Sequence, residues 1–246
     1  MFISSSGEYP IEMVGWTIPP PKTPEKTSNE LLEEREKKVK WLIQERFLRS
    51  ESIIKAMLKV PREEFIPEHY RDYAYLEVPF PLPGREATIS CPHSYPLFYE
   101  ALGLKEGEKL LEVGTGSGYG AALAKEIVGS SGKVVTIEID EDTLSFAEQN
   151  MKKLGYDVDL IHGDGSLGHA PEAPYDKICI TASCPEVPSP LIQQLKQQGR
   201  LITPVGAPES TQDLILVEKS VDGTLTRKFI IQVLYVPLKG KHGWFE

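Results

Sequence analysis

The sequence predicts an α/β protein built on a doubly wound, mostly parallel sheet with helices on both faces. Between residues 109 and 205, short apolar segments alternate with amphipathic segments of helical period. A glycine-rich loop, "GTGSG" at 114–118, separates the first apolar segment from the first amphipathic one. The chain of 246 residues, 40% of them hydrophobic, is long enough to bury the core of one such domain.

The predicted domain begins after a proline-rich extension at residues 1–26, which contains "IPPPKTPEK" and little hydrophobic periodicity. Thr27 and Glu30 have the spacing of a capping box, which predicts the start of a charged helix. A second amphipathic helix follows and stops before Pro61. The next stretch is rich in proline and aromatic residues, and we expect a packed, irregular segment beside an active site.

The parallel sheet and its helices are predicted from the alternation after residue 106. The strands are expected at 109–113, 134–139, 158–162, 177–181 and 200–205, and the helices at 119–128, 141–154 and 191–198. Right-handed crossovers connect such units. The turn "VDGT" between two apolar runs then predicts an antiparallel hairpin at one edge of the sheet. The single domain is therefore expected at 27–240, with a helical and substrate-loop part at 27–105, a cofactor-binding sheet at 106–206, a hairpin at 207–240 and a tail at 241–246.

Charge and cysteine content exclude several classes of protein. The formal net charge of -9 argues against a nucleic-acid partner, because phosphate recognition needs a clustered basic face. No apolar run approaches the ~20 residues that cross a bilayer, and the first ten residues lack the pattern of a signal peptide. Three cysteines without a CxxC pair indicate reduced, buried thiols in the cytoplasm and no metal site. A homo-oligomer is left open.

The glycine-rich loop fits two kinds of nucleotide cofactor. Gly116, Gly118 and Ala121 match the dinucleotide pattern G-x-G-x-x-A, and the acidic Glu138 follows about twenty residues later. Glu112, just before the glycines, favours a different ligand, because a carboxylate there repels a pyrophosphate and attracts a cationic sulfonium amino acid. An alternative role for Glu112 is to accept hydrogen bonds from the N–H groups of the loop itself.

Two further carboxylates support S-adenosylmethionine as the cofactor. Glu138 ends the second predicted strand, where it can accept hydrogen bonds from a ribose diol. Asp164, in "HGDG", ends the third predicted strand beside the expected position of an adenine amino group. These positions favour S-adenosylmethionine over a nicotinamide dinucleotide.

The segment "ATISCPHSY" at 87–95 places Thr88, Ser90 and His93 close together. These hydroxyl groups can bond their own backbone, and local capping explains them as well as catalysis does. A nucleophilic Ser–His pair is disfavoured because the chain has no G-x-S-x-G elbow. The cluster does supply neutral or weakly cationic donors that suit an anion.

Taken together, these segments resemble the protein-L-isoaspartate O-methyltransferase family. The resemblance rests on "VPREEFIPE", "AYLE", "ATISCPH", "LLEVGTGSGYGAA", "IEID", "HGDGSLG", "APYDKICITAS", "QLKQQGRLITPVG" and "YVPLKGKHGW", in the order and spacing of the family. The stretch before residue 29 lies outside it. "VPFPLPGREATIS" and "GSLGHAPE" depart from the family pattern, which leaves details of the substrate loop open.

The resemblance implies a Rossmann-like class I methyltransferase fold and a repair reaction. Members transfer the methyl group of S-adenosyl-L-methionine to the free α-carboxylate of L-isoaspartyl residues in damaged proteins and peptides, and they release S-adenosyl-L-homocysteine. A carboxylate is already ionised at pH 7, so no general base is needed. An RNA or small-molecule methyltransferase, a non-catalytic binding protein and a nicotinamide dehydrogenase remain as alternatives.

The resemblance also implies roles for individual residues. Ser90 is expected to be the catalytic residue that orients the substrate carboxylate. Residues expected at the substrate are Thr88, Ser90, His93 and Gln212, and those expected at the cofactor are His93, Glu112, Gly114, Gly116, Gly118, Glu138, Asp164 and Gly165.

Independently of the resemblance, the Asp222–Gly223 pair is expected to rearrange on ageing, because glycine leaves the attacking backbone nitrogen unhindered.

Overall fold

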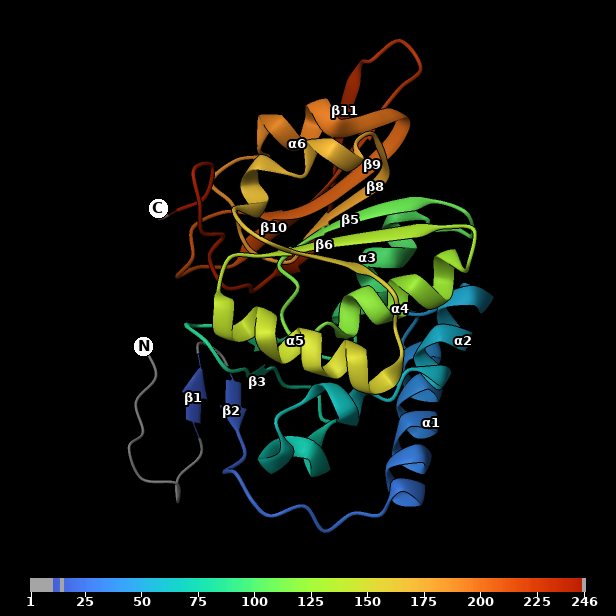
Figure 1. Ribbon diagram of the computed structural model, residues 1–246, viewed down its shortest axis with the longest axis vertical. Coiled ribbons are helices and arrows are strands. Elements are labelled where there is room, and N and C mark those ends of the chain that lie inside the picture. The colour runs from blue at the N-terminus through green and yellow to red at the C-terminus, as the bar shows by residue number, and fades with distance from the viewer. Residues whose placement is uncertain (1–10, 14–15, 245–246) are drawn as a thin grey trace.

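A seven-stranded sheet forms the centre of the computed structural model, which describes residues 11–13 and 16–244 (Figure 1). The strand order is β11-β10-β9-β8-β5-β6-β7. The strands are β5 Lys109–Val113, β6 Lys133–Glu138, β7 Asp159–His162, β8 Tyr175–Ile180, β9 Leu195–Val205, β10 Gln212–Lys219 and β11 Leu225–Val233. The strands from β5 to β9 pair in parallel, whereas β10 and β11 are antiparallel and form one edge.

Both faces of the central strands are buried, as their near-continuous apolar sequences require, whereas the edge strand β11 is largely exposed. Leu110 belongs to the core cluster on the side of α4 and α5, and its neighbour Leu111 belongs to the cluster on the side of α6. Figure 1 shows α6 on one side of the sheet and α3, α4 and α5 on the other. The helices are α1 Ser28–Gln44, α2 Glu51–Lys59, α3 Ser94–Leu102, α4 Tyr119–Val128, α5 Glu141–Leu154 and α6 Ser189–Gln194. This confirms the predicted doubly wound class.

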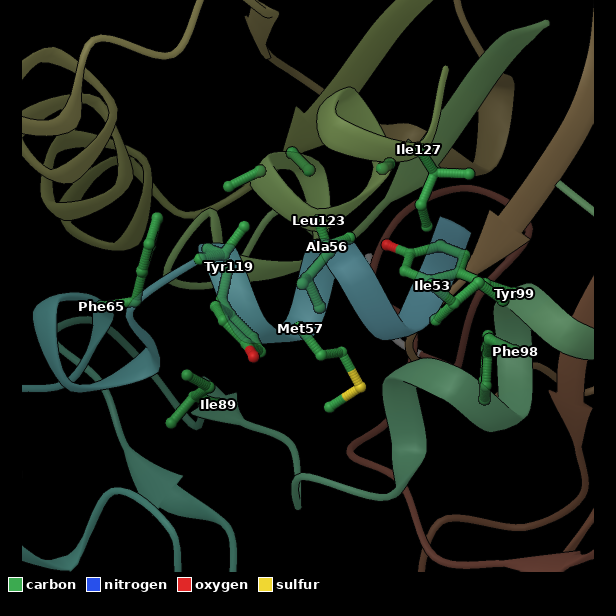
Figure 2. Close-up of a cluster of buried hydrophobic side chains, with 14 of the residues drawn as sticks. Ile53, Ala56, Met57, Phe65, Ile89, Phe98, Tyr99, Tyr119, Leu123 and Ile127 are labelled. Carbon is green, nitrogen blue, oxygen red and sulfur yellow. The ribbon is translucent and has the colours of Figure 1, made fainter. Parts of the chain in front are cut away.

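The first helices form an outer layer against α4. The capping box at the start of α1 is present, with the Glu30 N–H donating to the Thr27 hydroxyl and the Glu30 carboxylate accepting from the Thr27 N–H at 2.7 Å. Figure 2 shows Met57 of α2 beside Leu123 of α4, with Phe98 of α3 at the edge of the same cluster. This packing joins the N-terminal helices to the helix that follows the glycine-rich loop.

The bounds predicted for the third helix, 191–198, are wrong, because α6 begins at Ser189 and ends at Gln194, where the strand β9 follows from Leu195. Leu195 pairs with Tyr175 of β8 and is 2% exposed. Sheet pairing and burial therefore override the helical pattern of "LIQQLKQQ". The strand is also longer than the predicted 200–205.

Part of the proline-rich extension has regular structure. The short strands β1 Ile11–Met13 and β2 Trp16–Ile18 pair with each other, whereas residues 1–10 lie outside the described chain. The buried carboxylate of Asp72 accepts from the Glu25 N–H at 2.8 Å and forms an ion pair with Lys22 at 2.9 Å. Asp72 lies in a 3-10 turn, η2 Glu68–Tyr73, that follows η1 Arg62–Phe65.

The edge hairpin turns at residues 220–224. The Asp222 carboxylate accepts from the Thr224 N–H at 3.0 Å and from the Ser220 hydroxyl. These bonds, the hydroxyl's first, lower the pKa of Asp222 to about 2. Among the residues that the structure describes, no helix has the length and apolar character needed to cross a membrane.

Candidate active site

A pocket lies at the carboxyl ends of β5, β6 and β8, the edge where open parallel sheets bind their ligands. Its walls come from the glycine-rich loop, the ends of the three strands, the segment 85–90 and the C-terminal segment 236–239. Seven of the residues predicted for the site line it: Thr88, Ser90, Glu112, Gly114, Gly116, Glu138 and Gly165. Segments distant in sequence therefore meet around one cavity.

The glycine-rich loop depends on backbone angles that L side chains rarely adopt. Gly114, Gly116 and Gly118 have φ values of 94°, 56° and 85°. At Gly114 an added Cβ would lie 2.4 Å from the hydroxyl oxygen of Thr181, which donates to the carbonyl oxygens of Val113 and Gly114. The loop consequently presents bare backbone to the pocket.

Glu112 is a buried carboxyl group on the floor of the pocket. Its side chain is 2% exposed and accepts a hydrogen bond from the Thr136 hydroxyl at 2.7 Å. Burial raises the pKa of Glu112 to about 8, which the Thr136 hydrogen bond only partly offsets. A bound cation would favour the ionised form of this group. No hydrogen bond joins Glu112 to the glycine-rich loop, so the alternative role considered for it falls instead to Glu138.

Glu138 ends β6 and serves three backbone donors. It accepts from the Gly116 N–H at 3.0 Å through one oxygen, and from Ile139 and Asp140 through the other. Burial raises the pKa of Glu138, although these hydrogen bonds act in the opposite direction. The carboxylate therefore orders the loop and still faces the pocket, with lone pairs left for a ligand hydroxyl.

A short hairpin brings Thr88 and Ser90 to the pocket. The strands β3 Phe80–Pro81 and β4 Thr88–Ile89 pair in antiparallel fashion, and the Leu82 N–H donates to the Ala87 carbonyl at 2.9 Å. Behind Ser90, the guanidinium group of buried Arg62 donates to the Ser90 carbonyl at 2.7 Å. The ring of Tyr95 completes this wall.

The loop between β3 and β4 forms hydrogen bonds with the start of α5 and with the C-terminal segment. The Thr143 hydroxyl donates to the Pro83 carbonyl at 2.8 Å, and the Arg85 N–H donates to the Asp140 carboxylate at 3.2 Å. From the C-terminal segment, the Lys239 ammonium donates to the Arg85 carbonyl at 2.9 Å. The loop is thereby connected to both the start of α5 and the chain end.

His93 and Gln212, two residues predicted for the site, lie outside the pocket walls. His93 Nδ1 is 2.6 Å from a carboxylate oxygen of Glu77, whose other oxygen binds Lys38. Gln212 is fully buried, and its side-chain oxygen accepts from the Tyr235 N–H at 2.8 Å. Both side chains are thus engaged in contacts that support the surrounding chain.

Asp164 and Gly118 also lie outside the walls. Asp164 accepts from the Ser166 N–H and hydroxyl and, at 2.8 Å, from the Lys241 N–H, which fastens the C-terminal segment. Gly118 is the N-cap of α4. Sequence reasoning missed Arg62, Tyr95, Thr181 and the segment 236–239. Most of them lie in segments that carry the resemblance, such as Arg62 in "VPREEFIPE", but nothing in the sequence marked them as neighbours of the pocket.

The chain is similar to one family over most of its length. The family model described as protein-L-isoaspartate(D-aspartate) O-methyltransferase matches residues 33–243. A protein-L-isoaspartate O-methyltransferase of Methanococcus aeolicus is 49% identical over 84% of this chain and 94% of its own length. One of the two from Archaeoglobus fulgidus is 48% identical over 86% of this chain and 95% of its own.

Two solved structures have the same fold. A structure described as a protein-L-isoaspartate O-methyltransferase superposes with a TM-score of 0.75 at 33% identity, covering 82% of this chain and 65% of the other. A putative protein-L-isoaspartate O-methyltransferase from Plasmodium falciparum, in complex with S-adenosyl-L-homocysteine, gives a TM-score of 0.72 at 26% identity, covering 87% and 99%.

Proposed function

The chain belongs to the protein-L-isoaspartate (D-aspartate) O-methyltransferase family, and we propose which residues of its pocket bind the cofactor and which bind the substrate. The protein transfers the methyl group of S-adenosyl-L-methionine to the free α-carboxylate of L-isoaspartyl residues in damaged proteins and peptides. S-adenosyl-L-homocysteine is the second product.

The cofactor end of the pocket consists of the two buried carboxyl groups and the glycine-rich loop. The donor set fits the cofactor, because Glu112 offers a buried carboxylate to a cationic methionine moiety and Glu138 offers acceptors to a ribose diol. Gly114, Gly116 and Gly165 leave room for the ligand to approach the backbone closely. The bound cofactor supplies an electrophilic methyl group on a positively charged sulfur.

Ser90 holds the substrate in this proposal. Its hydroxyl donates to one oxygen of the isoaspartyl carboxylate, and Thr88 contributes to the same wall. A hydroxyl donor orients the anion without reducing its nucleophilicity as much as a direct guanidinium contact would. The attacking oxygen needs no general base, since an α-carboxylate with a pKa of about 3.5 is ionised at neutral pH.

In this scheme the protein accelerates the reaction by positioning the substrate carboxylate against the methyl group of the cofactor. The second carboxylate oxygen is aimed in line with the methyl carbon and the sulfur, and the loop 82–87 and the segment 236–239 exclude water from the reacting atoms. Orientation of this kind can lower a barrier by up to about 7–11 kcal/mol. The observation that carries the proposal is that Ser90, Glu112 and Glu138 line a single pocket although they come from three separate segments.

We also propose the cytoplasm as the location of the protein. Cys91, Cys179 and Cys184 are all free and buried, which fits a reducing compartment. Isoaspartyl-containing proteins and peptides of that compartment would be its substrates.

The decisive experiment uses two peptides that differ only in having isoaspartate or normal aspartate at one position. We expect base-labile methyl ester from labelled S-adenosylmethionine on the isoaspartyl peptide alone. Ser90→Ala should lower kcat/KM for that peptide about 100-fold while changing S-adenosylhomocysteine binding less than twofold. Equal methylation of both peptides, or unaltered kinetics in Ser90→Ala, would reject the assignment.

A further inference from the structure

Arg62 is a buried cation that lies directly behind the wall of the pocket. It begins η1, and its side chain is 1% exposed. Its Nε donates to the Ala74 carbonyl and its Nη2 to the Ser90 carbonyl, both at 2.7 Å. Figure 2 shows the surroundings of this turn, where the ring of Phe65 lies beside that of Tyr119.

The guanidinium group has no carboxylate partner among the described residues. The neighbouring Glu63 is already paired with Arg35 at 2.6 Å and accepts from the Tyr75 hydroxyl. The Nη1 atom of Arg62 has no hydrogen-bond partner within the same part of the chain. Besides the two carbonyl oxygens, the rings of Tyr119 and Tyr95 lie near the charge, with centroids 5.4 Å and 5.8 Å from Cζ.

An unpaired buried charge lowers the stability of the folded protein, so we expect Arg62 to have a function that offsets this cost. Arginine remains protonated at every physiological pH, and burying such a charge without a counterion destabilises the folded protein. Away from water, the field of the charge reaches further than it would at the surface. Ser90, whose carbonyl accepts from Arg62, and Tyr95, whose ring lies near it, both line the cavity.

We propose that Arg62 is a positioning residue of the methyl transfer: it fixes the backbone of Ser90 and supplies the positive charge that favours the substrate carboxylate there. This inference rests on the proposed role of Ser90. The cation acts through one intervening residue and donates no hydrogen bond to the nucleophilic oxygen. It also offsets the two carboxyl groups, Glu112 and Glu138, that share the pocket and would otherwise repel an anionic substrate.

The test uses calorimetry to measure how tightly two peptides bind to the complex of the enzyme with S-adenosylhomocysteine. One peptide carries an isoaspartyl α-carboxylate and the other the neutral α-carboxamide at the same position. We expect wild type to bind the carboxylate at least tenfold more tightly. Arg62→Met should reduce this preference to about threefold or less, whereas Arg62→Lys, which retains the charge, should keep most of it.

The control variant is Arg71→Met, which removes a guanidinium group that donates to the Lys26 carbonyl and does not line the pocket. Its preference for the carboxylate should equal that of wild type. Affinity for S-adenosylhomocysteine should change less than twofold in every variant, which a general loss of structure would not allow. An unchanged preference in Arg62→Met, or a preference lost equally in Arg62→Lys, would overturn the inference.

A measurement on wild type keeps the inference testable if Arg62→Met does not fold. A buried charge is little screened by salt, so the carboxylate preference should change less than twofold between 0.05 M and 0.5 M salt. A preference that disappears at high salt would assign the attraction to surface charges instead. If wild type methylates no isoaspartyl peptide, the proposed function itself fails; if it does and the preference ignores Arg62, only this inference fails.

Discussion

Replacing Gly120 by alanine should destabilise the protein through a single contact. Gly120 lies in the first turn of α4, where an added Cβ would lie 2.2 Å from Oε1 of Glu112. The next nearest atom is Cδ of the same carboxyl group at 3.3 Å, and an atom of the Tyr95 ring follows at an ordinary 3.4 Å. The carboxyl group must therefore move by more than 1 Å, away from its hydrogen bond with Thr136.

The magnitude follows from two opposing effects. Alanine is favoured over glycine inside a helix by about 1 kcal/mol, and Gly120 does not have a positive φ that would cancel this gain. Overpacking a dense site costs about 1–3 kcal/mol. Gly120→Ala should thus lower the free energy of unfolding by up to about 2 kcal/mol. In a Glu112→Ala background, where the clash is absent, the same change should raise it by about 1 kcal/mol.

The assay is a double-mutant cycle by urea unfolding of the four proteins, with S-adenosylhomocysteine affinity measured beside it. The effect of Gly120→Ala should change sign between the two backgrounds, and in the wild-type background cofactor affinity should fall about tenfold as Glu112 is displaced. An effect of the same sign and size in both backgrounds would refute the reasoning, because it would then arise from something other than the Glu112 contact.

Three further predictions test the surroundings of the pocket. Burial raises the pKa of Glu112 from 4.5 to about 8, so between these pH values the folded state holds a proton that the unfolded state has lost. The free energy of unfolding should therefore fall as the pH rises through this range, by up to about 1.4 kcal/mol per pH unit. Unfolding of Glu112→Gln should lack this slope. Thr143→Val removes the donor to the Pro83 carbonyl, so stopped-flow dissociation of S-adenosylhomocysteine should accelerate about three- to tenfold, with exposed Thr226→Val unchanged. Asp164→Ala frees the Lys241 N–H, so trypsin should remove the chain end faster while cofactor affinity stays within twofold; a tenfold loss of affinity with the chain end still protected would place Asp164 at the cofactor instead.

Local sequence was sufficient to predict the elements whose own residues determine them. The capping box at Thr27, the helices α4 and α5, and the strand–loop–helix around the glycines depend on neighbouring residues, and the structure contains all of them. The start of β9 was not predictable in this way. Leu195 belongs to the strand because of its partner Tyr175, which is twenty residues away in the sequence.

The positions of single side chains were harder to predict than the pocket itself. His93 lies only three residues from Ser90, yet it turns toward Glu77, a carboxylate that the sequence does not mark as its partner. Asp164 and Gln212 bind backbone groups of a chain end that approaches only in the folded protein. Arg62 contributes through its position behind Ser90, which no spacing rule reveals. Proximity along the chain therefore predicts which segments form the site better than which side chains face it.

The turn at Asp222 bears on how durable a repair enzyme is. Closure of a succinimide at an Asp–Gly pair expels water from the side-chain carboxyl, which the protonated acid allows and the carboxylate resists. The lowered pKa of Asp222 makes its protonated form still rarer at neutral pH than in an ordinary aspartate, and one carboxylate oxygen accepts from the Thr224 N–H. We therefore expect Asp222–Gly223 to form succinimide more slowly in the folded protein than in an unfolded peptide of the same sequence, so that the repair enzyme accumulates less of its own substrate in this turn than the dipeptide alone predicts.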